Sequence, residues 1–308
     1  MEESPSAQQQ PGEPEGPLVT ALIVSHNSGE ALHRCVAALE ASQGRDRMEI
    51  LVVDQGSRDG SAALDADFPD ITPLRLPKHF GMTKARNIGV RTAKGEYLLL
   101  LAPEVTVQPE TAITMAQRMI ADSSIGLAAP RLSGASGQPL PQTAPFPAAG
   151  DLSAWAKAGV PWRAAEGTGA PAASGGGAIP AECLSSRALM VRRQTIVGMN
   201  YFDERFGQYW SDVEMCFRVR RGGKNALVFS DLSVTDAGEP APPSNWVAAL
   251  EADRRLGAIA FAGKHFGTGT QVGLYLSQLL GALGSPGGFG AFSRILSGQK
   301  VDGTEQFD

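Results

Sequence analysis

The sequence predicts an α/β protein with a mostly parallel sheet flanked by helices. Short apolar runs alternate with segments of helical periodicity from residue 18 to residue 101, which is typical of parallel strands joined by right-handed crossovers. The clearest strand is the leucine run at 98–101. It is too short for a buried helix, and Pro103 follows it, as expected for a central strand buried on both faces.

The first half of the chain supplies four expected strands and the helices between them. Residues 18–24 and 48–53 are continuous, β-rich apolar runs that suit buried strands. In chain order, the expected elements are strands at 18–24, 48–53, 72–76 and 98–101, and helices at 31–39, 61–67 and 81–93.

The second half contains a long stretch without periodicity. Residues 133–180 are rich in Ala, Gly and Pro, and we expect a variable, partly ordered flap there, since a loop this long is usually functional or disordered. Around it, the expected strands are 125–132, 186–191 and one or two within 226–234, and the expected helices are 109–121, 210–221, 246–265, 271–283 and 289–296.

These elements divide the 308 residues into three parts. Residues 1–17 have almost no apolar content and are expected to be a disordered tail, because burial cannot offset their ordering entropy. Residues 18–240 are expected to form the α/β domain, and residues 241–308 a C-terminal helical extension. The hydrophobic content of 43% is enough for a core of this size.

Composition excludes several classes of function. The net charge of −5 gives no basic field for nucleic acid. Three widely spaced cysteines, Cys35, Cys183 and Cys216, indicate a reducing compartment rather than a disulfide framework or a zinc site. We find no signal-peptide pattern and no apolar run long enough for a membrane span. The expected location is therefore the cytoplasm.

Three acidic residues stand where an open α/β sheet binds its ligands, just beyond strand ends or at a helix start. Asp54 could accept hydrogen bonds from a nucleobase or a ribose, or form an Asx turn into Gly56. Glu104 could carry chemistry or simply cap a helix. Asp212 could be a general base for a substrate hydroxyl, or a capping carboxylate at the first turn of its helix.

Arg86 is the candidate cation. It lies near the start of the helix expected at 81–93, where its planar fork and the helix N-terminus together suit a diphosphate. The alternative is an ordinary solvated arginine on the protein surface. Each of these signals is weak by itself.

Their order along the chain is more specific. The sequence resembles family 2 glycosyltransferases of the GT-A fold, especially the rhamnosyltransferase-like bacterial branch, over about residues 18–236. The matching pieces are VSHN (24–27), VVDQGSRDG (52–60), GMTKARNIG (81–89), GEYLLLL (95–101), MVRR (190–193), FDERF (202–206) and SDVEMCFR (211–218).

The resemblance implies an enzyme that takes sugar from a nucleotide-diphosphate donor and inverts the anomeric carbon in one displacement. By position, it assigns Asn27, Asp54 and Asp59 to the nucleoside pocket. It assigns Arg86 and Asn87 to the ribose or diphosphate, Glu104 to the last acid of a metal-binding motif, and Asp212 to the base that deprotonates the acceptor hydroxyl.

The sequence departs from the family pattern around this site. Ala102-Pro-Glu104 stands where two acids or Asn-Pro-Asp are usual, Ser211 replaces the Glu before the base, and Glu214 replaces an Asp. Ser186-Arg187 stands where Gly-Ala is expected after Leu184, and Asp236 stands in place of a late histidine. Glu104 and Asp236 are both hard oxygen ligands, so the resemblance implies a Mg²⁺ or Mn²⁺ site with a degenerate motif.

We therefore expect an inverting glycosyltransferase that uses a UDP- or dTDP-sugar to build a surface polysaccharide or glycolipid. The rival hypothesis is a catalytically silent homologue that binds nucleotide or glycan, or serves as a scaffold. A nicotinamide dehydrogenase is a poor third, because residues 25–29 lack the G-x-G-x-x-G cradle.

The C-terminal extension contains one notably apolar segment. Residues 272–283 are apolar around much of a helix and too short to span a bilayer. We expect this segment to pack against the domain or against a second copy in a homodimer. The alternative is peripheral contact with the inner face of the membrane, near a lipid-linked acceptor, which the negative net charge disfavours.

Overall fold

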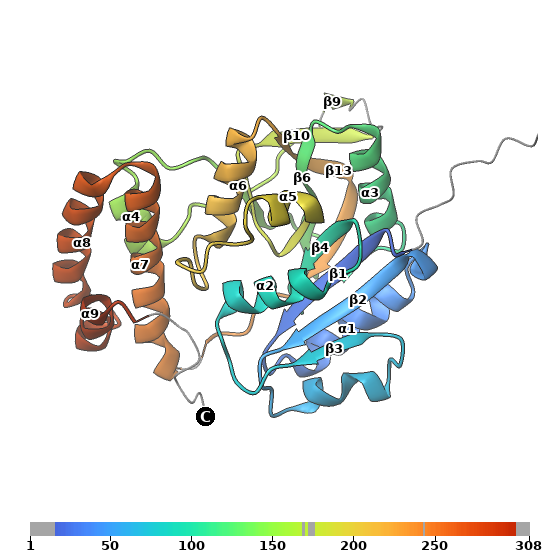
Figure 1. Ribbon diagram of the computed structural model, residues 1–308, viewed down its shortest axis with the longest axis horizontal. Helices are drawn as coiled ribbons and strands as arrows, with labels where there is room; N and C mark the ends of the chain where they lie inside the picture. The colour runs from blue at the N-terminus through green and yellow to red at the C-terminus, as the bar shows by residue number, and fades with distance from the viewer. Residues whose placement is uncertain (1–15, 168–169, 172–175, 243, 300–308) are drawn as a thin grey trace, which may run out of the picture.

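A ten-stranded sheet runs through the molecule in the computed structural model (Figure 1). The structure describes residues 16–167, 170–171, 176–242 and 244–299. The tail expected at 1–17 therefore lies outside the described residues except for its last two positions. The strand order is β3-β2-β1-β4-β12-β6-β13-β10-β9, and β5 pairs with β13.

The N-terminal half of the sheet is parallel, as expected. It consists of β1 (Val19–Ser25), β2 (Met48–Asp54), β3 (Thr72–Arg75) and β4 (Tyr97–Leu101). All five residues of β4 are buried, and β4 lies between β1 and β12. The leucine run is thus a central strand, which confirms the prediction made from its composition.

The C-terminal half mixes directions. Here β6 (Ile125–Gly134) and β13 (Asn225–Asp236) are parallel to each other, whereas β12 (Ala188–Arg192) is antiparallel to both β4 and β6. The outer strands β10 (Gly177–Ala181) and β5 (Val105–Val107) are antiparallel to β13, and β9 (Ala170–Pro171) pairs with β10. The mostly parallel sheet is confirmed, and β12, β10 and β5 are antiparallel to their neighbours in it.

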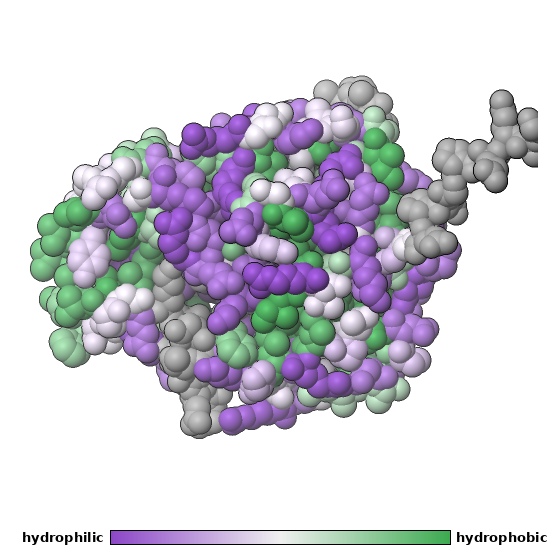
Figure 2. All heavy atoms as spheres, in the orientation of Figure 1, coloured by the Kyte–Doolittle hydropathy of each residue, from purple (hydrophilic) through white to green (hydrophobic). Residues whose placement is uncertain are grey.

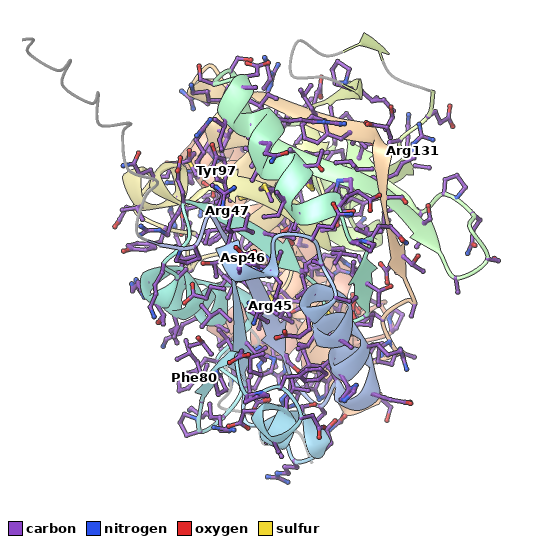
Figure 3. The ribbon with its side chains drawn as sticks, turned by 90° about the vertical axis from the view of Figure 1, so that its right-hand side faces the viewer. Arg45, Asp46, Arg47, Phe80, Tyr97 and Arg131 are labelled. Atoms are coloured by element: carbon purple, nitrogen blue, oxygen red, sulfur yellow. The ribbon has the colours of Figure 1, made fainter. Side chains whose placement is uncertain are left out.

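Helices cover both faces of the sheet (Figures 1 and 3). One face carries α1 (Gly29–Glu40) and α3 (Thr111–Ala121), which bury their apolar sides in one core cluster. The other carries α2 (Met82–Thr92), the short α5 (Arg193–Gly198) and α6 (Ser211–Arg221). The helix expected at 61–67 is a 3₁₀ helix, η2 (Gly60–Ala66), and a further 3₁₀ turn, η1, spans Arg45–Arg47.

The segment 133–180 holds more regular structure than its composition predicts. It contains β7 (Pro141–Ala144), α4 (Leu152–Ala158) and β8 (Arg163–Ala164), and β7 pairs with both β8 and β11 (Cys183–Leu184) in a small sheet. These elements are too short for periodicity to reveal. Trp155 of α4 packs against Trp210 with ring centroids 6.0 Å apart.

The C-terminal helices form the other end of the molecule (Figure 1). After η3 (Ser244–Trp246) come α7 (Val247–His265), α8 (Thr268–Ala282) and α9 (Gly288–Ser297). α7 approaches the domain closely at Gly257, where an added Cβ would lie 2.7 Å from the Trp210 ring. Since only glycine fits there, α7 is seated tightly on the loop that leads into α6.

Candidate active site

The candidate residues gather where the parallel strands end. The carboxyl ends of β1, β2 and β4 share one edge of the sheet, because these strands are adjacent and parallel. Ligands of open α/β sheets bind in the crevice at such an edge. The predicted residues form two groups there, one in the turns after β1 and β2 and one around the ends of β4 and β13.

The first group begins with Asn27 and Asp54, which meet through Ser57. The backbone N–H of Asn27 donates to Ser57 Oγ at 2.8 Å, and Asn27 has a positive φ of 49°. Ser57 donates its own N–H to Asp54 Oδ2 at 3.1 Å and its hydroxyl to Asp54 Oδ1. Asp54 therefore orders the turn after β2, as the Asx-turn alternative expected.

Asp59 completes the first group. Its Oδ1 accepts the Ser61 N–H at 3.0 Å and caps η2, while Ser61 Oγ accepts the Gly29 N–H at 2.7 Å. Gly29 has a φ of +40°, and a Cβ there would lie 3.1 Å from Asp59 Oδ2. The turns after β1 and β2 are thus locked together by side-chain oxygens.

The second group contains Asp212, which is held by two neighbours. Arg86 Nη1 lies 3.2 Å from Asp212 Oδ1, and the Ser186 N–H donates to Asp212 Oδ2 at 3.0 Å. Arg86 Nη2 also donates to Ser186 Oγ at 2.5 Å. Asp212 lies in the first turn of α6 and its side chain keeps 21% of its exposure. It is a fixed carboxylate that solvent and small molecules can still reach.

The same group contains a buried charge cluster centred on Arg187. Its Nη2 donates to Glu104 Oε2 at 3.1 Å and to Asp236 Oδ1 at 2.7 Å, and its Nε donates to Asp236 Oδ2. Burial raises the pKa of Glu104, and the positive charge of Arg187 opposes that shift only in part. Burial also disfavours the charge on Arg187, but Asp236 and Glu104 outweigh it and raise the pKa of the guanidinium.

Ser186 and Arg187 connect the two halves of this group, because consecutive residues bind Asp212 on one side and Glu104 with Asp236 on the other. The segment is fixed against β4, since the Ala102 N–H donates to the Arg187 carbonyl at 2.8 Å. One short connection beside the sheet edge therefore contacts the candidate base, Asp212, through Ser186 and carries the guanidinium of Arg187.

Part of the chain matches a known protein family. Residues 20–143 match the model of the family described as glycosyl transferase family 2. The match covers less than half of the chain, and over this stretch the chain is similar to family 2 glycosyltransferases. The succinoglycan biosynthesis protein ExoO of Rhizobium meliloti is 32% identical over 104 residues, which cover 33% of this chain and 30% of ExoO. The chain thus matches less than a third of that relative's length.

Solved structures extend the likeness of fold beyond that stretch. GalNAc-T7, solved with UDP, GalNAc and Mn²⁺, superposes with a TM-score of 0.57 and 16% identity, covering 78% of this chain and 48% of its own. A mannosyltransferase from Pyrobaculum calidifontis, solved with GDP-Man and Mn²⁺, superposes with a TM-score of 0.54 and 15% identity, covering 92% and 74%. The GT-A-like fold therefore includes β12, α6 and β13, which carry or flank the Asp212 and Arg187 group.

The residues of this chain do not fit the divalent cation expected from the family resemblance. Glu104 and Asp236 do lie together, but the guanidinium of Arg187 sits between their carboxylates. Within the described ranges, no group of three or more His, Cys, Asp or Glu side chains is arranged to hold a metal ion. An ion bound by both carboxylates would have to displace Arg187.

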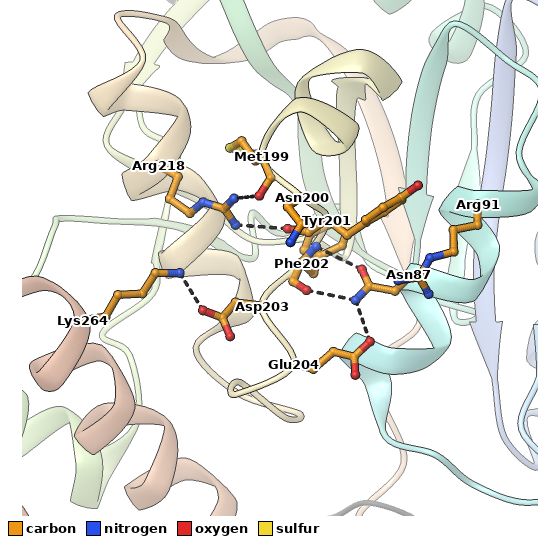
Figure 4. Close-up of a pocket in the computed structure, with 10 residues that line it drawn as sticks. All are labelled: Asn87, Arg91, Met199, Asn200, Tyr201, Phe202, Asp203, Glu204, Arg218 and Lys264. Atoms are coloured by element: carbon orange, nitrogen blue, oxygen red, sulfur yellow. Dashed lines mark hydrogen bonds and ion pairs between the residues drawn. The ribbon is translucent and has the colours of Figure 1, made fainter.

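Asn87 lies apart from the other predicted residues of the glycosyltransferase site. Its side chain is buried, its Nδ2 donates to the Phe202 carbonyl at 2.9 Å and to Glu204 Oε1 at 3.1 Å, and its Oδ1 accepts the Phe202 N–H at 3.0 Å. Figure 4 shows these contacts in a hollow of about 410 Å³ between α2, the 199–204 segment, α6 and α7. This geometry ties α2 to the 199–204 segment and does not direct Asn87 toward the sheet edge.

The charged groups around that hollow are engaged with one another. Lys264 pairs with Asp203 at 2.6 Å, and Arg218 donates to the carbonyls of Met199 and Tyr201 (Figure 4). Lys264 also pairs with Glu214 at 2.5 Å. Burial disfavours the charge of Asp203, but Arg205 and Lys264 outweigh it and hold its pKa below the usual range. Such mutual pairing is typical of a structural network rather than of a ligand site.

Sequence reasoning assigned no role to Arg187 or to the aromatic cluster of His26, His79 and Trp246. The Trp246 ring stacks on His26 with centroids 5.9 Å apart and meets the His79 ring edge-on at 5.5 Å. The sequence offered two signals. Arg187 stands where the family has a small residue, and Trp246 stands just before the last helices. Neither signal identifies its partners, which come from distant parts of the chain.

His79 gives a prediction about pH. Burial, with the charge of His26 nearby, lowers the pKa of His79 to about 4, and its Nδ1 accepts the Gly81 N–H at 3.2 Å. Below about pH 6.5 the unfolded chain binds a proton at this position that the folded chain does not bind until about pH 4. Stability should therefore fall as pH falls through this window, by up to about 3 kcal/mol from this residue.

Thermal or urea unfolding between pH 7.5 and about pH 4.5 checks this prediction. His79→Gln keeps a hydrogen-bond acceptor but does not titrate, so it should flatten the pH dependence. His33→Gln is the matched control, because His33 is half exposed on α1. Equal pH dependence in the wild type and His79→Gln would contradict the assignment.

Proposed function

We propose that this chain transfers a sugar from a UDP- or dTDP-linked donor to a glycan or lipid-linked acceptor, with inversion at the anomeric carbon. The observation that carries the proposal is the fixed, partly exposed Asp212 carboxylate beside Arg86 and next to the Arg187 cluster at the carboxyl edge of the sheet. The family 2 match at residues 20–143 supports the reaction class. The rhamnosyltransferase-like motifs are the reason to include dTDP-sugars.

In this reaction Asp212 would act as the general base. One of its oxygens accepts the proton of the acceptor hydroxyl while that hydroxyl oxygen forms a bond to the anomeric carbon. The bond from this carbon to the donor diphosphate breaks at the same time, and the nucleoside diphosphate leaves with the electron pair. Arg86 orients the carboxylate, since its Nη1 lies 3.2 Å from Asp212 Oδ1.

The nucleoside end of the donor would lie over the turns after β1 and β2. Asn27, Asp54 and Asp59 order these turns. In the proposed complex, the polar atoms of these three side chains would also bind the base or the ribose. The rings of His26 and Trp246 beside Asn27 offer planar surfaces on which a base can stack. Asn87 would act indirectly here, by holding α2 and with it Arg86.

The name of ExoO, a succinoglycan biosynthesis protein, supports a role in the synthesis of a surface polysaccharide. We propose the same broad role for this chain, with a polymer or its lipid-linked precursor as acceptor. Among the described residues, no helix combines the length and apolar character needed to cross a bilayer.

A donor-hydrolysis assay with a panel of nucleotide sugars tests the proposal. The wild type should release nucleoside diphosphate from at least one UDP- or dTDP-sugar, because water can replace the acceptor slowly in an assembled site. No release from any donor, and no transfer to simple alcohols or sugars, would contradict it.

A second function remains open because Asp212 is ion-paired with Arg86. This pairing, together with the altered residues Ala102, Ser211 and Asp236, favours a silent homologue that binds nucleotide or glycan, or acts as a scaffold. The two proposals differ in one observable. A silent homologue binds nucleoside diphosphate in calorimetry but releases nothing from the donor panel.

We also propose that α8 pairs with a second copy of the chain. Exposed side chains lie along one side of this helix, with Val272 at 52%, Leu276 at 55% and Leu280 at 69% of full exposure. Figure 2 shows the hydrophobic surface at that end of the molecule. No residue of α8 carries a charge, whereas helices that rest on membranes are usually rich in Lys and Arg. Self-association therefore suits this face better than anionic lipid.

Leu280→Glu tests the α8 contact. We expect the wild type to dimerise in light scattering at several protein concentrations, and Leu280→Glu to weaken dimerisation at least about tenfold by burying a charge. Ile120→Glu is the matched control, since Ile120 is 51% exposed on α3. A wild type that stays monomeric, or that cosediments with anionic liposomes through this helix, would contradict the proposal.

A further inference from the structure

The proposed transfer needs a positive charge to stabilise the departing diphosphate. We infer that Arg187 supplies this charge, and that nucleoside diphosphates bind to this chain without a divalent cation. The inference rests on the proposed function, and it follows from how the guanidinium is placed among the groups around it.

The placement of Arg187 is that of a resident cation. Its side chain is 25% exposed, whereas the side chains of Glu104 and Asp236 are only 9% and 3% exposed. The guanidinium thus covers two buried carboxylates while part of the Arg187 side chain stays exposed to solvent. The positions that a hard divalent ion would use are taken by Nε and Nη2.

The donor count of the guanidinium leaves room for a phosphate. Arginine has five N–H groups, and three of them point to Glu104 and Asp236. The nearest acceptor recorded for Nη1 is Glu239 Oε2 at 3.7 Å, which is too long for a hydrogen bond. Glu239 is 65% exposed, so a diphosphate oxygen can take its place. The planar fork of arginine suits such an oxygen pair.

The neighbouring residue strengthens the inference. Ser186, next to Arg187, hydrogen-bonds to Asp212 and Arg86. The cation is therefore one residue away from the group that holds the proposed base. In an inverting displacement the base and the leaving group lie on opposite faces of the anomeric carbon, so the sugar would lie between Asp212 and a phosphate bound at Nη1.

The rival explanation is a purely structural salt bridge. In that case Arg187 would only neutralise Glu104 and Asp236, and its loss would affect stability but not nucleotide binding. A divalent ion could then bind elsewhere with the donor. The two explanations differ in the metal dependence of nucleotide binding by the wild type, which requires no variant.

Calorimetric titration of UDP, dTDP and GDP into the full chain, in EDTA and in Mn²⁺, is the test. We expect at least one nucleotide to bind equally well in both, within a factor of about two. Arg187→Ala should weaken that binding at least about tenfold, and Arg187→Lys should recover part of it, since it keeps the charge but loses the fork. Arg118→Ala is the matched control, because Arg118 also pairs with a carboxylate, Asp231, at 2.8 Å.

The outcomes separate this inference from the proposed function. Binding that requires Mn²⁺ would overturn the inference and leave the proposed function standing. Unchanged binding by a folded Arg187→Ala variant would also overturn it. No nucleotide binding in any condition would overturn both. Equal binding in EDTA and Mn²⁺ that is lost on removal of Arg187 would establish the guanidinium as the cation.

Discussion

Asp212→Asn should lower sugar transfer by about two to four orders of magnitude while leaving the fold and donor binding unchanged. The asparagine amide keeps the size of the carboxylate and can still accept the Ser186 N–H, but it cannot take a proton from the acceptor hydroxyl. Initial rates of donor turnover, with binding measured separately, give the result.

Asp122→Asn is a suitable control for this variant. Asp122 lies just before β6, at the opposite edge of the sheet, and accepts the Ser124 N–H at 2.9 Å. If Asp212 is only a helix-capping carboxylate, Asp212→Asn should cost a few tenths to about 1 kcal/mol of stability and leave turnover near normal. A folded Asp212→Asn variant with wild-type turnover would remove Asp212 from the role of base.

Asp253→Ala should destabilise the protein by about 3 kcal/mol. Asp253 of α7 is fully buried, and its Oδ2 accepts the backbone N–H groups of Gln208 at 2.8 Å and Tyr209 at 3.2 Å. Alanine would leave both N–H groups without this acceptor. Because they belong to the loop that leads into α6, the same change should also lower transfer by disturbing Asp212.

Asp253→Asn separates the two contributions of this side chain. Its carbonyl oxygen can accept from both N–H groups, so about half of the lost stability should return. Urea unfolding of the three proteins measures the series. An alanine variant within about 0.5 kcal/mol of the wild type would show that α7 does not hold this loop.

The N-terminal half of the fold could be predicted from sequence because its signals are local. The buried runs that became β1, β2 and β4 are bounded by turn residues, and the helix α1 shows apolar residues at regular spacing. Each of these elements is long enough for its period to be visible. The same reasoning failed in and just after the flap, where the strands β8 and β11 have two residues each.

The candidate site was predictable only in part. The position of Asp54 after a buried strand indicated its turn, and Asp54 does order it, whereas Asp59 was named only through the family resemblance and caps η2. The Arg187 cluster could not be predicted, since Glu104 and Asp236 lie 83 and 49 residues away from Arg187 in the chain. The three residues come together because β12 is inserted antiparallel between β4 and β6, and no local sequence pattern predicts that insertion.

Asn87 illustrates a different limit. Its place in the motif of residues 81–89 gives the residue type but not the direction of the side chain. In the structure, adjacent residues of α2 face different partners: Arg86 pairs with Asp212, and Asn87 bonds to Phe202. Adjacent positions on a helix point about 100° apart, so a motif match cannot assign both to one ligand.

The central claim is that this site carries out an inverting transfer from a nucleotide sugar. Proton NMR of the first product, formed from an α-linked donor with a simple alcohol as acceptor, tests it most directly. A single displacement with Asp212 as base should give the β-glycoside from the wild type and almost none from Asp212→Asn. An α-glycoside, or no product from any donor, would contradict the account.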